Sequence, residues 1–122
     1  MEALAKIEEV LEFSRRTGAS WLDAELHRKK GELLLVVADA DGAQAEQEFA
    51  CAINIARKQA AKLLELRAAT TLARLWAIQG KRSSAQVLLQ PICAQFGKDV
   101  DVPDVRDANA LLADTKVDRA PN

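Results

Sequence analysis

The chain has 122 residues, of which 49% are apolar and only 4% aromatic, and this composition is typical of one alanine- and leucine-rich helical domain. Its 17 Lys and Arg residues balance 18 Asp and Glu residues, so net charge gives no reason to expect nucleic acid or an anionic membrane as a partner. No apolar run approaches the ~20 residues that cross a bilayer, and the acidic, amphipathic N-terminal segment is unlike a signal peptide. We therefore expect a cytoplasmic protein.

Helical periodicity predicts about six helices and no strand, hence an all-α fold. In chain order the helices are expected at residues 2–17, 21–38 with Ser20 as N-cap, 43–59, 62–79, 83–95 and 103–114. Pro91 is expected to kink the fifth helix, because proline removes a backbone donor and clashes with the preceding turn. The helical domain is therefore predicted to span residues 1–114, and the polar residues 115–122 are predicted to form a disordered tail.

Three helices repeat one pattern of small and large apolar residues, with spacings of four and then three. The copies are Ala3-Ile7-Val10, Ala45-Phe49-Ala52 and Ala85-Leu89-Ile92. They lie 42 and then 40 residues apart, from Ala3 to Ala45 to Ala85, a period typical of stacked antiparallel hairpins. The second and third helices then form one hairpin and the fourth and fifth another. The first helix corresponds to the second helix of a hairpin that lacks its first.

The same register predicts which large side chains meet at the centre of the stack. These are expected to be Phe49, Leu72, Trp76 and Leu89, because each falls at a large-residue or inward-facing position of its helix.

The hairpin pattern resembles the tetratricopeptide repeat. Small residues in the first helix of each hairpin are followed three positions later by large ones, and the second helix adds the pattern of small and large apolar residues given above. The first-helix pairs are Gly31 with Leu34 and Ala73 with Trp76. Two departures are a period longer than the standard unit of ~34 residues, and Arg57 at the position where the family often has proline.

Two longer stretches are similar to the C-terminal repeat region of large bacterial regulators that carry a cyclase-type domain and an AAA-type ATPase module. They are residues 24–35 and residues 64–81. Lys29 stands where this group commonly has leucine, and Val102 where a Thr or Ser usually precedes the proline. The resemblance implies a right-handed superhelix and a non-catalytic protein-binding or regulatory role within a larger signalling ATPase or cyclase-type regulator. Neither a phosphate-binding Gly-Lys-Ser/Thr loop nor a pair of cyclase aspartates occurs.

The resemblance also places a partner-binding groove along the first helices of the hairpins. The groove-facing positions are Glu25, Arg28, Glu32, Leu35, Arg67, Thr70, Arg74 and Ala77. In one interpretation the two glutamates pair with Arg67 and Arg74 and only fix the stacking. In the other, spare guanidinium groups bind carboxylates of a peptide or of upstream domains of the same polypeptide. The asparagines of the family's carboxylate clamp are absent.

Self-association is a further expectation, because a first helix without its hairpin partner would expose an apolar face. The residues expected at a homodimer contact are Leu4, Leu11, Phe13 and Trp21. Two alternative functions therefore stay open: a free-standing self-associating adaptor, and a small-molecule sensor that binds an effector between the helices.

Catalytic chemistry is not indicated. His27 is the only histidine, and Cys51 and Cys93 stand far apart in the sequence, so neither a nucleophile–base pair nor a zinc cluster can be assembled. The basic run at residues 28–30 is expected to lie on a solvated helix face. We expect no enzyme activity, no cofactor, no metal, and two buried or half-buried thiols.

Overall fold

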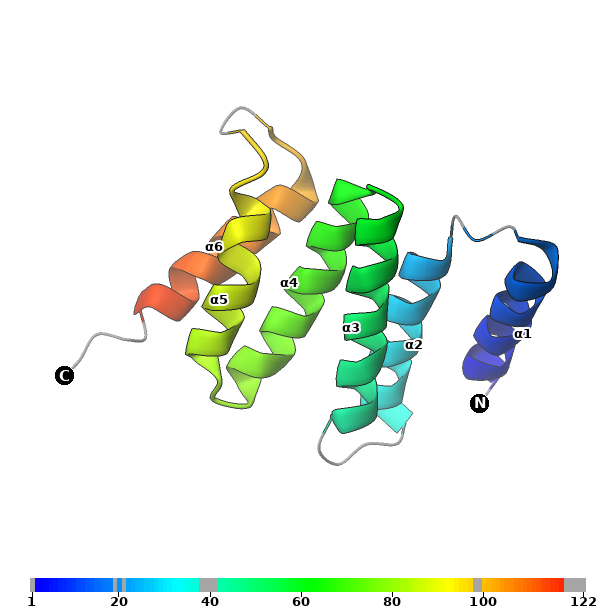
Figure 1. The fold of residues 1–122 in the computed structure, drawn as a ribbon. Coiled ribbons are helices and arrows are strands. Elements are labelled where there is room, and N and C mark those ends of the chain that lie inside the picture. Colours follow the sequence, from blue (N-terminus) through cyan, green and yellow to red (C-terminus); the bar gives the residue numbers. More distant parts are fainter. Residues whose placement is uncertain (1, 19, 21, 38–41, 98–99, 118–122) are drawn as a thin grey trace.

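The computed structural model describes residues 2–18, 20, 22–37, 42–97 and 100–117. In these residues the chain is all-helical, with six helices and no strand (Figure 1). The helices are α1 (Glu2–Thr17), α2 (Asp23–Val37), α3 (Ala43–Lys58), α4 (Lys62–Ile78), α5 (Arg82–Cys93) and α6 (Pro103–Val117). The predicted all-α fold with about six helices is therefore confirmed.

Successive helices run up and down in turn and form an elongated row, with the two ends of the chain at opposite ends of the row (Figure 1). Each helix packs against the next one, and α4 also contacts both α2 and α6. Of the described helices, α1 packs against α2 alone. The helices α2, α4 and α6 therefore form a continuous inner series, while α3 and α5 lie outside it and pack against its members.

Burial follows the sequence repeat in two of its three copies. The copies in α3 and α5 are fully buried, with Phe49 and Leu89 at their centres. In α1 the equivalent residues Ala3 and Val10 are exposed and Ile7 is only half-buried, because no described helix covers that side. The pattern is thus present in α1 without the neighbour that buries it elsewhere.

The predicted centre of the stack is confirmed at three of its four positions. Phe49, Leu72 and Leu89 are buried in one continuous apolar cluster. Trp76 is only half-buried and packs against the edge of that cluster, where its ring borders a shallow hollow beside Val87. The prediction that Trp76 lies at the centre of the stack is therefore wrong, because its ring lies at the edge of the cluster and stays partly exposed.

α3 and α4 end in the same hydrogen-bonded turn, a Schellman motif. After α3, the amide of Ala61 donates to the carbonyl of Ala56 at 2.9 Å, and the intervening Ala60 has a φ of 55°. After α4, the amide of Lys81 donates to the carbonyl five residues earlier at 2.7 Å, and Gly80 has a φ of 84°. The two junctions therefore share one geometry, although only one of them has the glycine that suits it.

Arg57, which stands where the tetratricopeptide family often has proline, makes an ion pair between α3 and α4. It lies in the last turn of α3, and its Nε donates to Oε2 of Glu65 at 2.6 Å. Glu65 is buried in α4, so this bond satisfies a carboxylate that would otherwise be costly to bury. The pair joins two successive hairpins.

Helix bounds differ most from the predicted ones at the start of α2 and at the ends of α5 and α6. α2 begins at Asp23 rather than at residue 21, and Trp21 lies outside the described residues. α6 continues to Val117, beyond the predicted end at residue 114, and Thr115 is buried with its hydroxyl donating to the carbonyl of Leu112 at 2.8 Å. The predicted tail therefore starts too early, since its first residue belongs to the packed helix. α5 passes through Pro91 and ends two residues later, at Cys93.

The outer side of α6 is polar where the same side of α4 is apolar. Shifting α4 by the 40-residue period aligns its buried Glu65, Ala68, Leu72 and Leu75 with the buried Val105, Ala108, Leu112 and Thr115 of α6. The same shift aligns the buried Leu66, Ala69 and Ala73 with the exposed Arg106, Asn109 and Ala113. α6 thus buries one side and presents the other to solvent.

Candidate functional site

A cleft of about 280 Å³ crosses the inner series of helices. It is lined entirely by polar and charged side chains from α2, α4 and α6: Arg28, Glu32, Arg67, Thr70, Thr71, Arg74, Asp104 and Asp107. Five of these eight residues belong to the predicted groove: Arg28, Glu32, Arg67, Thr70 and Arg74. We call the space lined by the eight residues the cleft. Glu25 borders it through its contacts with Arg28 and Arg67.

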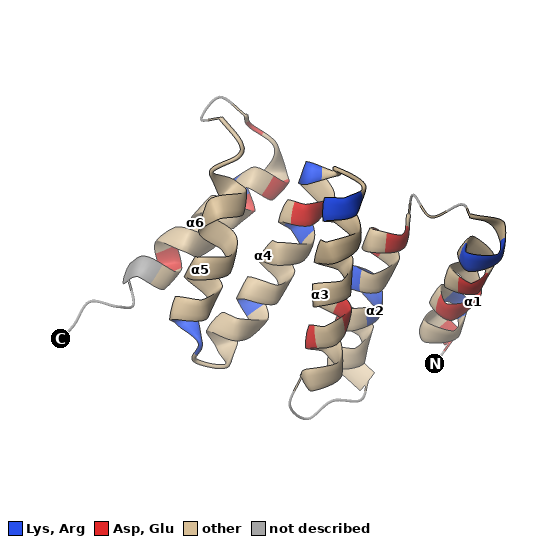
Figure 2. Cartoon of the chain, viewed as in Figure 1, with Lys and Arg blue, Asp and Glu red and all other residues tan. Residues whose placement is uncertain are grey.

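The charges of the cleft alternate from helix to helix in the register of the repeat. Glu25, Arg67 and Asp107 occupy one equivalent position, and Glu32, Arg74 and Asp114 another. Each α4 arginine thus lies in a row between an acid of α2 and an acid of α6. Figure 2 shows the same intermingling of acidic and basic residues along the chain, without a large patch of one sign.

One end of the cleft is held by a network around Glu25. The Arg28 Nη2 donates to Glu25 Oε2 at 2.6 Å, and Arg67 Nη1 donates to the same oxygen at 3.2 Å. Arg67 Nη2 also donates to Asp104 Oδ2 at 2.8 Å, which links α2, α4 and α6. The interpretation that Glu25 and Arg67 fix the stacking is therefore supported here. Glu32, in contrast, accepts from Arg28 Nη1 of its own helix at 3.0 Å.

These contacts shift the pKa values of Glu25, Arg28 and Arg67. Burial would by itself raise the pKa of Glu25, but the hydrogen bonds and charges of Arg28 and Arg67 outweigh it and lower the pKa below its ordinary value. The hydrogen bond to Glu25 raises the pKa of Arg28, and the one to Asp104 raises that of Arg67. Glu25, Arg28 and Arg67 are therefore ionised at neutral pH, and Arg28, whose side chain is only 11% exposed, is occupied by its contacts with Glu25 and Glu32.

Arg74 and Asp107 differ from the other charges of the cleft. Neither makes a hydrogen bond or ion pair with any residue that the structure describes, and both are exposed. Together they also line an adjoining hollow of about 370 Å³ that includes Asp114. Among the described residues the cleft therefore offers one free cation, Arg74, and one free anion, Asp107. Of the groove arginines that the second interpretation treats as spare, Arg74 alone has no partner among the described residues.

Six positions distinguish the observed cleft from the predicted groove. Glu25, Leu35 and Ala77 belong to the predicted groove but not to the lining of the cleft. Leu35 packs against the apolar core and is not part of the lining, because it points toward the interior of the stack. Thr71, Asp104 and Asp107 line the cleft but were not predicted. The repeat offered a signal for Asp107, since it lies 40 residues after Arg67, at the equivalent position of the third inner helix.

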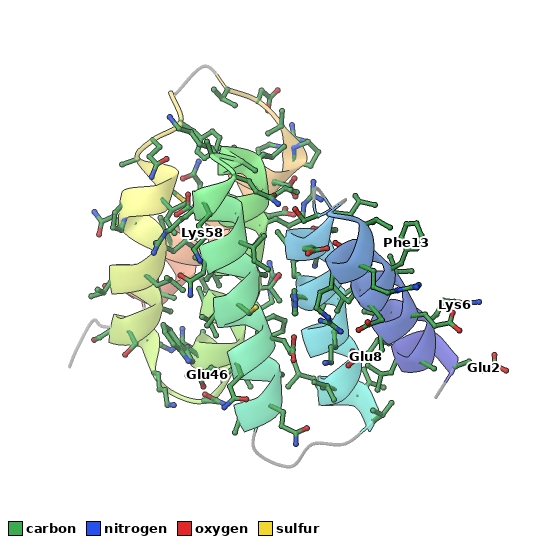
Figure 3. The ribbon with its side chains drawn as sticks, turned by 45° about the vertical axis from the view of Figure 1, so that its right-hand side comes forward. Glu2, Lys6, Glu8, Phe13, Glu46 and Lys58 are labelled. Atoms are coloured by element: carbon green, nitrogen blue, oxygen red, sulfur yellow. The ribbon has the colours of Figure 1, made fainter. Side chains whose placement is uncertain are left out.

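Of the residues predicted for self-association, two are buried or half-buried in the structure and one is exposed. Leu11 is only 2% exposed and Leu4 is half-buried, so the prediction that both lie on the open face is wrong: this side of α1 already packs against α2. Val10 and Phe13 are 39% and 54% exposed, and Figure 3 shows Phe13 projecting away from the other helices. Trp21 lies outside the described residues.

A second polar cluster joins α1, α2 and α3. His27 Nδ1 lies 2.7 Å from Glu48 Oε1, and Lys30 Nζ lies 3.3 Å from Glu48 Oε2 and also bonds to Glu8. The hydrogen bond from Lys30 lowers the pKa of Glu8. His27 is thus an interhelical residue. The prediction of a solvated basic face fails for Lys30 as for Arg28, because both reach carboxylates, and Lys29 alone in that run is exposed.

The two cysteines lie in separate helices, Cys51 in α3 and Cys93 in α5. Cys93 is buried and Cys51 half-buried, both as free thiols, and burial raises the pKa of each. Within the described part of the chain, no three His, Cys, Asp or Glu residues are grouped so that they could hold a metal ion. Among the described helices none has the length and apolarity to cross a membrane.

In comparisons with known proteins, no family model, no curated protein and no solved structure matches the chain.

Proposed function

We propose that this chain is a non-catalytic, protein-binding helical repeat domain whose cleft takes up a charged peptide segment. The observation that carries the proposal is the state of Arg74 and Asp107. Both line a cleft in which the neighbouring arginines are occupied, and both lack a described partner. A segment with a carboxylate beside a basic group would pair with both, and charge-assisted bonds of this kind are the strong ones at an interface.

The dimensions and lining of the cleft favour a peptide over a small-molecule effector. Effector pockets are mostly apolar and enclose ~300–1,000 Å³, whereas this cleft holds about 280 Å³ and has only polar and charged residues in its lining. Its continuation past Asp114 suits an extended chain. A sensor function is therefore the weaker candidate.

The proposal that the chain belongs to a larger regulator rests on its resemblance to the C-terminal repeat region of bacterial regulators. Contacts of α4 with both α2 and α6 are compatible with a tetratricopeptide-like superhelix, whose first helices line the concave side. We infer that the chain serves as a regulatory repeat segment of a bacterial signalling ATPase or cyclase-type regulator. Its partner is then either another protein or a segment of the same polypeptide.

The test is binding of short labelled peptides that pair one acidic and one basic residue at varied spacing, followed by fluorescence anisotropy. Arg74→Glu should weaken the best binder roughly ten- to hundredfold, as expected for loss of a charge-assisted bond. Arg16→Glu makes the same charge change at an exposed position of α1 and should leave binding unchanged. If no peptide binds, or if both variants weaken binding equally, the proposal fails.

A further inference from the structure

A second recess lies between α1 and α2, and its character is apolar. It holds about 460 Å³ and is lined by Ala3, Lys6, Ile7, Lys29, Glu32, Leu33 and Val36. We call it the α1–α2 groove. It shares only Glu32 with the cleft, so the two surfaces can be tested separately.

The repeat explains why this groove is open. α2 packs against both α3 and α4, and α4 packs against both α5 and α6. Since α1 corresponds to α3 by the 42-residue period, a helix equivalent to α2 would pack against both α1 and α2. The α1–α2 groove therefore lies where a helix of this type would sit, and its shape and charge can be deduced from the equivalent contacts inside the chain.

The shape of the occupant follows from Ile7. Its equivalent in α3 is Phe49, whose ring packs directly on the backbone of Gly31 in α2. In the next unit the small residue is Ala73. A helix that seats against Ile7 should accordingly present Gly or Ala there, because a larger side chain would hold the two helices apart.

The charge of the occupant follows from Lys6. Its equivalent in α3 is Glu48, which is contacted by His27 and Lys30 of α2. In α1 the sign is reversed, since Lys6 borders the groove together with Lys29. The side chain that faces Lys6 should therefore be a carboxylate rather than a cation.

We propose that the α1–α2 groove binds an amphipathic helix of a partner protein that carries a Gly or Ala stripe flanked by a carboxylate opposite Lys6. A second copy of this chain that docks through α6 fits poorly. The exposed side of α6 has Arg106 and Asn109, and Asn109 is the residue equivalent to His27. α6 would thus bring a polar surface and no carboxylate to Lys6.

The experiment uses the intact chain and synthetic helical peptides derived from α2, with capped ends because a helix of 15 residues is marginal alone. One peptide has the α2 sequence with His27→Glu and Lys30→Glu, and its matched control, the cationic peptide, keeps His27 and Lys30. By anisotropy, the acidic peptide should bind about tenfold or more tightly than the control, as expected for one charge-assisted contact.

Two variants of the chain locate and test the contact. Lys6→Glu changes an exposed side chain, so it preserves the fold and should reverse the preference toward the cationic peptide. Ile7→Glu should abolish binding of both peptides, whereas Val87→Glu, at an exposed position of α5, should not. Arg74→Glu should leave helix binding intact, which separates this result from the test of the cleft.

Binding without dependence on charge, or no binding of either peptide, would overturn the proposal. So would a stable dimer in sedimentation at micromolar concentration that Val10→Glu disrupts, because a second copy would then cover this face.

Discussion

The ring of Phe49 lies directly on the backbone of Gly31. A Cβ built on Gly31 would be 2.5 Å from Cε1 and 2.8 Å from Cδ1 of that ring, which is closer than real side chains approach. The α2–α3 hairpin is therefore closed by a pair in which one residue must be glycine because the other is a fully buried aromatic residue.

Gly31→Ala should destabilise the fold. Alanine gains ~0.5–1 kcal/mol in a helix interior, but overpacking a buried ring costs ~1–3 kcal/mol, so the net loss in the free energy of unfolding should be roughly 0.5–2 kcal/mol. Urea denaturation followed by circular dichroism measures it. Adding Phe49→Leu should recover part of the loss, while Gly97→Ala, where a Cβ meets nothing within 4 Å, serves as the control.

Phe49→Ala should lower the free energy of unfolding by ~3–5 kcal/mol, because the ring is fully buried at the centre of the apolar cluster. The matched change Phe13→Ala removes the same atoms from an exposed site and should cost far less. Thermal melts of the two variants compare them directly. Equal shifts in melting temperature would show that the proposed register of the stack is wrong.

Opposite substitutions in the two Schellman turns should change the stability of the fold in opposite directions. Ala60→Gly should stabilise the chain by about 1 kcal/mol, because Ala60 has a left-handed φ that a Cβ disfavours. Gly80→Ala should destabilise it by a similar amount, although a Cβ there would meet no neighbour. Denaturant midpoints test both, and a shift of the same sign in both variants would contradict the prediction.

Glu25 should make the fold sensitive to acid. Its pKa is lowered in the folded chain, so its ionised form contributes stability above its ordinary pKa of 4.5, and this is lost as the pH falls through the lower folded-state value. Glu25→Gln should therefore reduce stability at pH 7 and flatten its dependence on pH below 4.5. Glu12→Gln, in an exposed pair with Arg15, should change neither.

The helices and the buried positions could be predicted because both depend on periodicity within one segment. Phe49 and Leu89 follow from spacings of three and four residues. Trp76 could not be placed as reliably, since the exposure of its ring depends on how far α5 reaches across α4. The end of α6 was placed too early because Thr115 is polar, and only its burial against the stack shows that the helix continues.

The residues of the cleft could be predicted only in part. The positions of Arg67 and Arg74 follow from the groove that the resemblance implies, but the partners of each guanidinium group are set by distances between helices, which no local pattern encodes. The sequence leaves open whether Arg28 is spare, and in the structure Glu25 and Glu32 of its own helix lie within reach of its side chain. Asp104 belongs to no groove position and meets Arg67 only because α6 crosses α4 there.

The exposed sides of α1 and α6 differ in how readily a further helix could pack on them. A helix equivalent to α5 added after α6 would have to pack on Arg106 and Asn109, whose exposed polar groups would lose their hydration. A helix equivalent to α2 joined before α1 would instead meet Ala3, Ile7 and Val10, which are the apolar counterparts of buried residues in α3 and α5. Engineered versions of this protein can therefore be lengthened at the N-terminal end without redesigning the existing surface, whereas extension at the other end first requires a new α6.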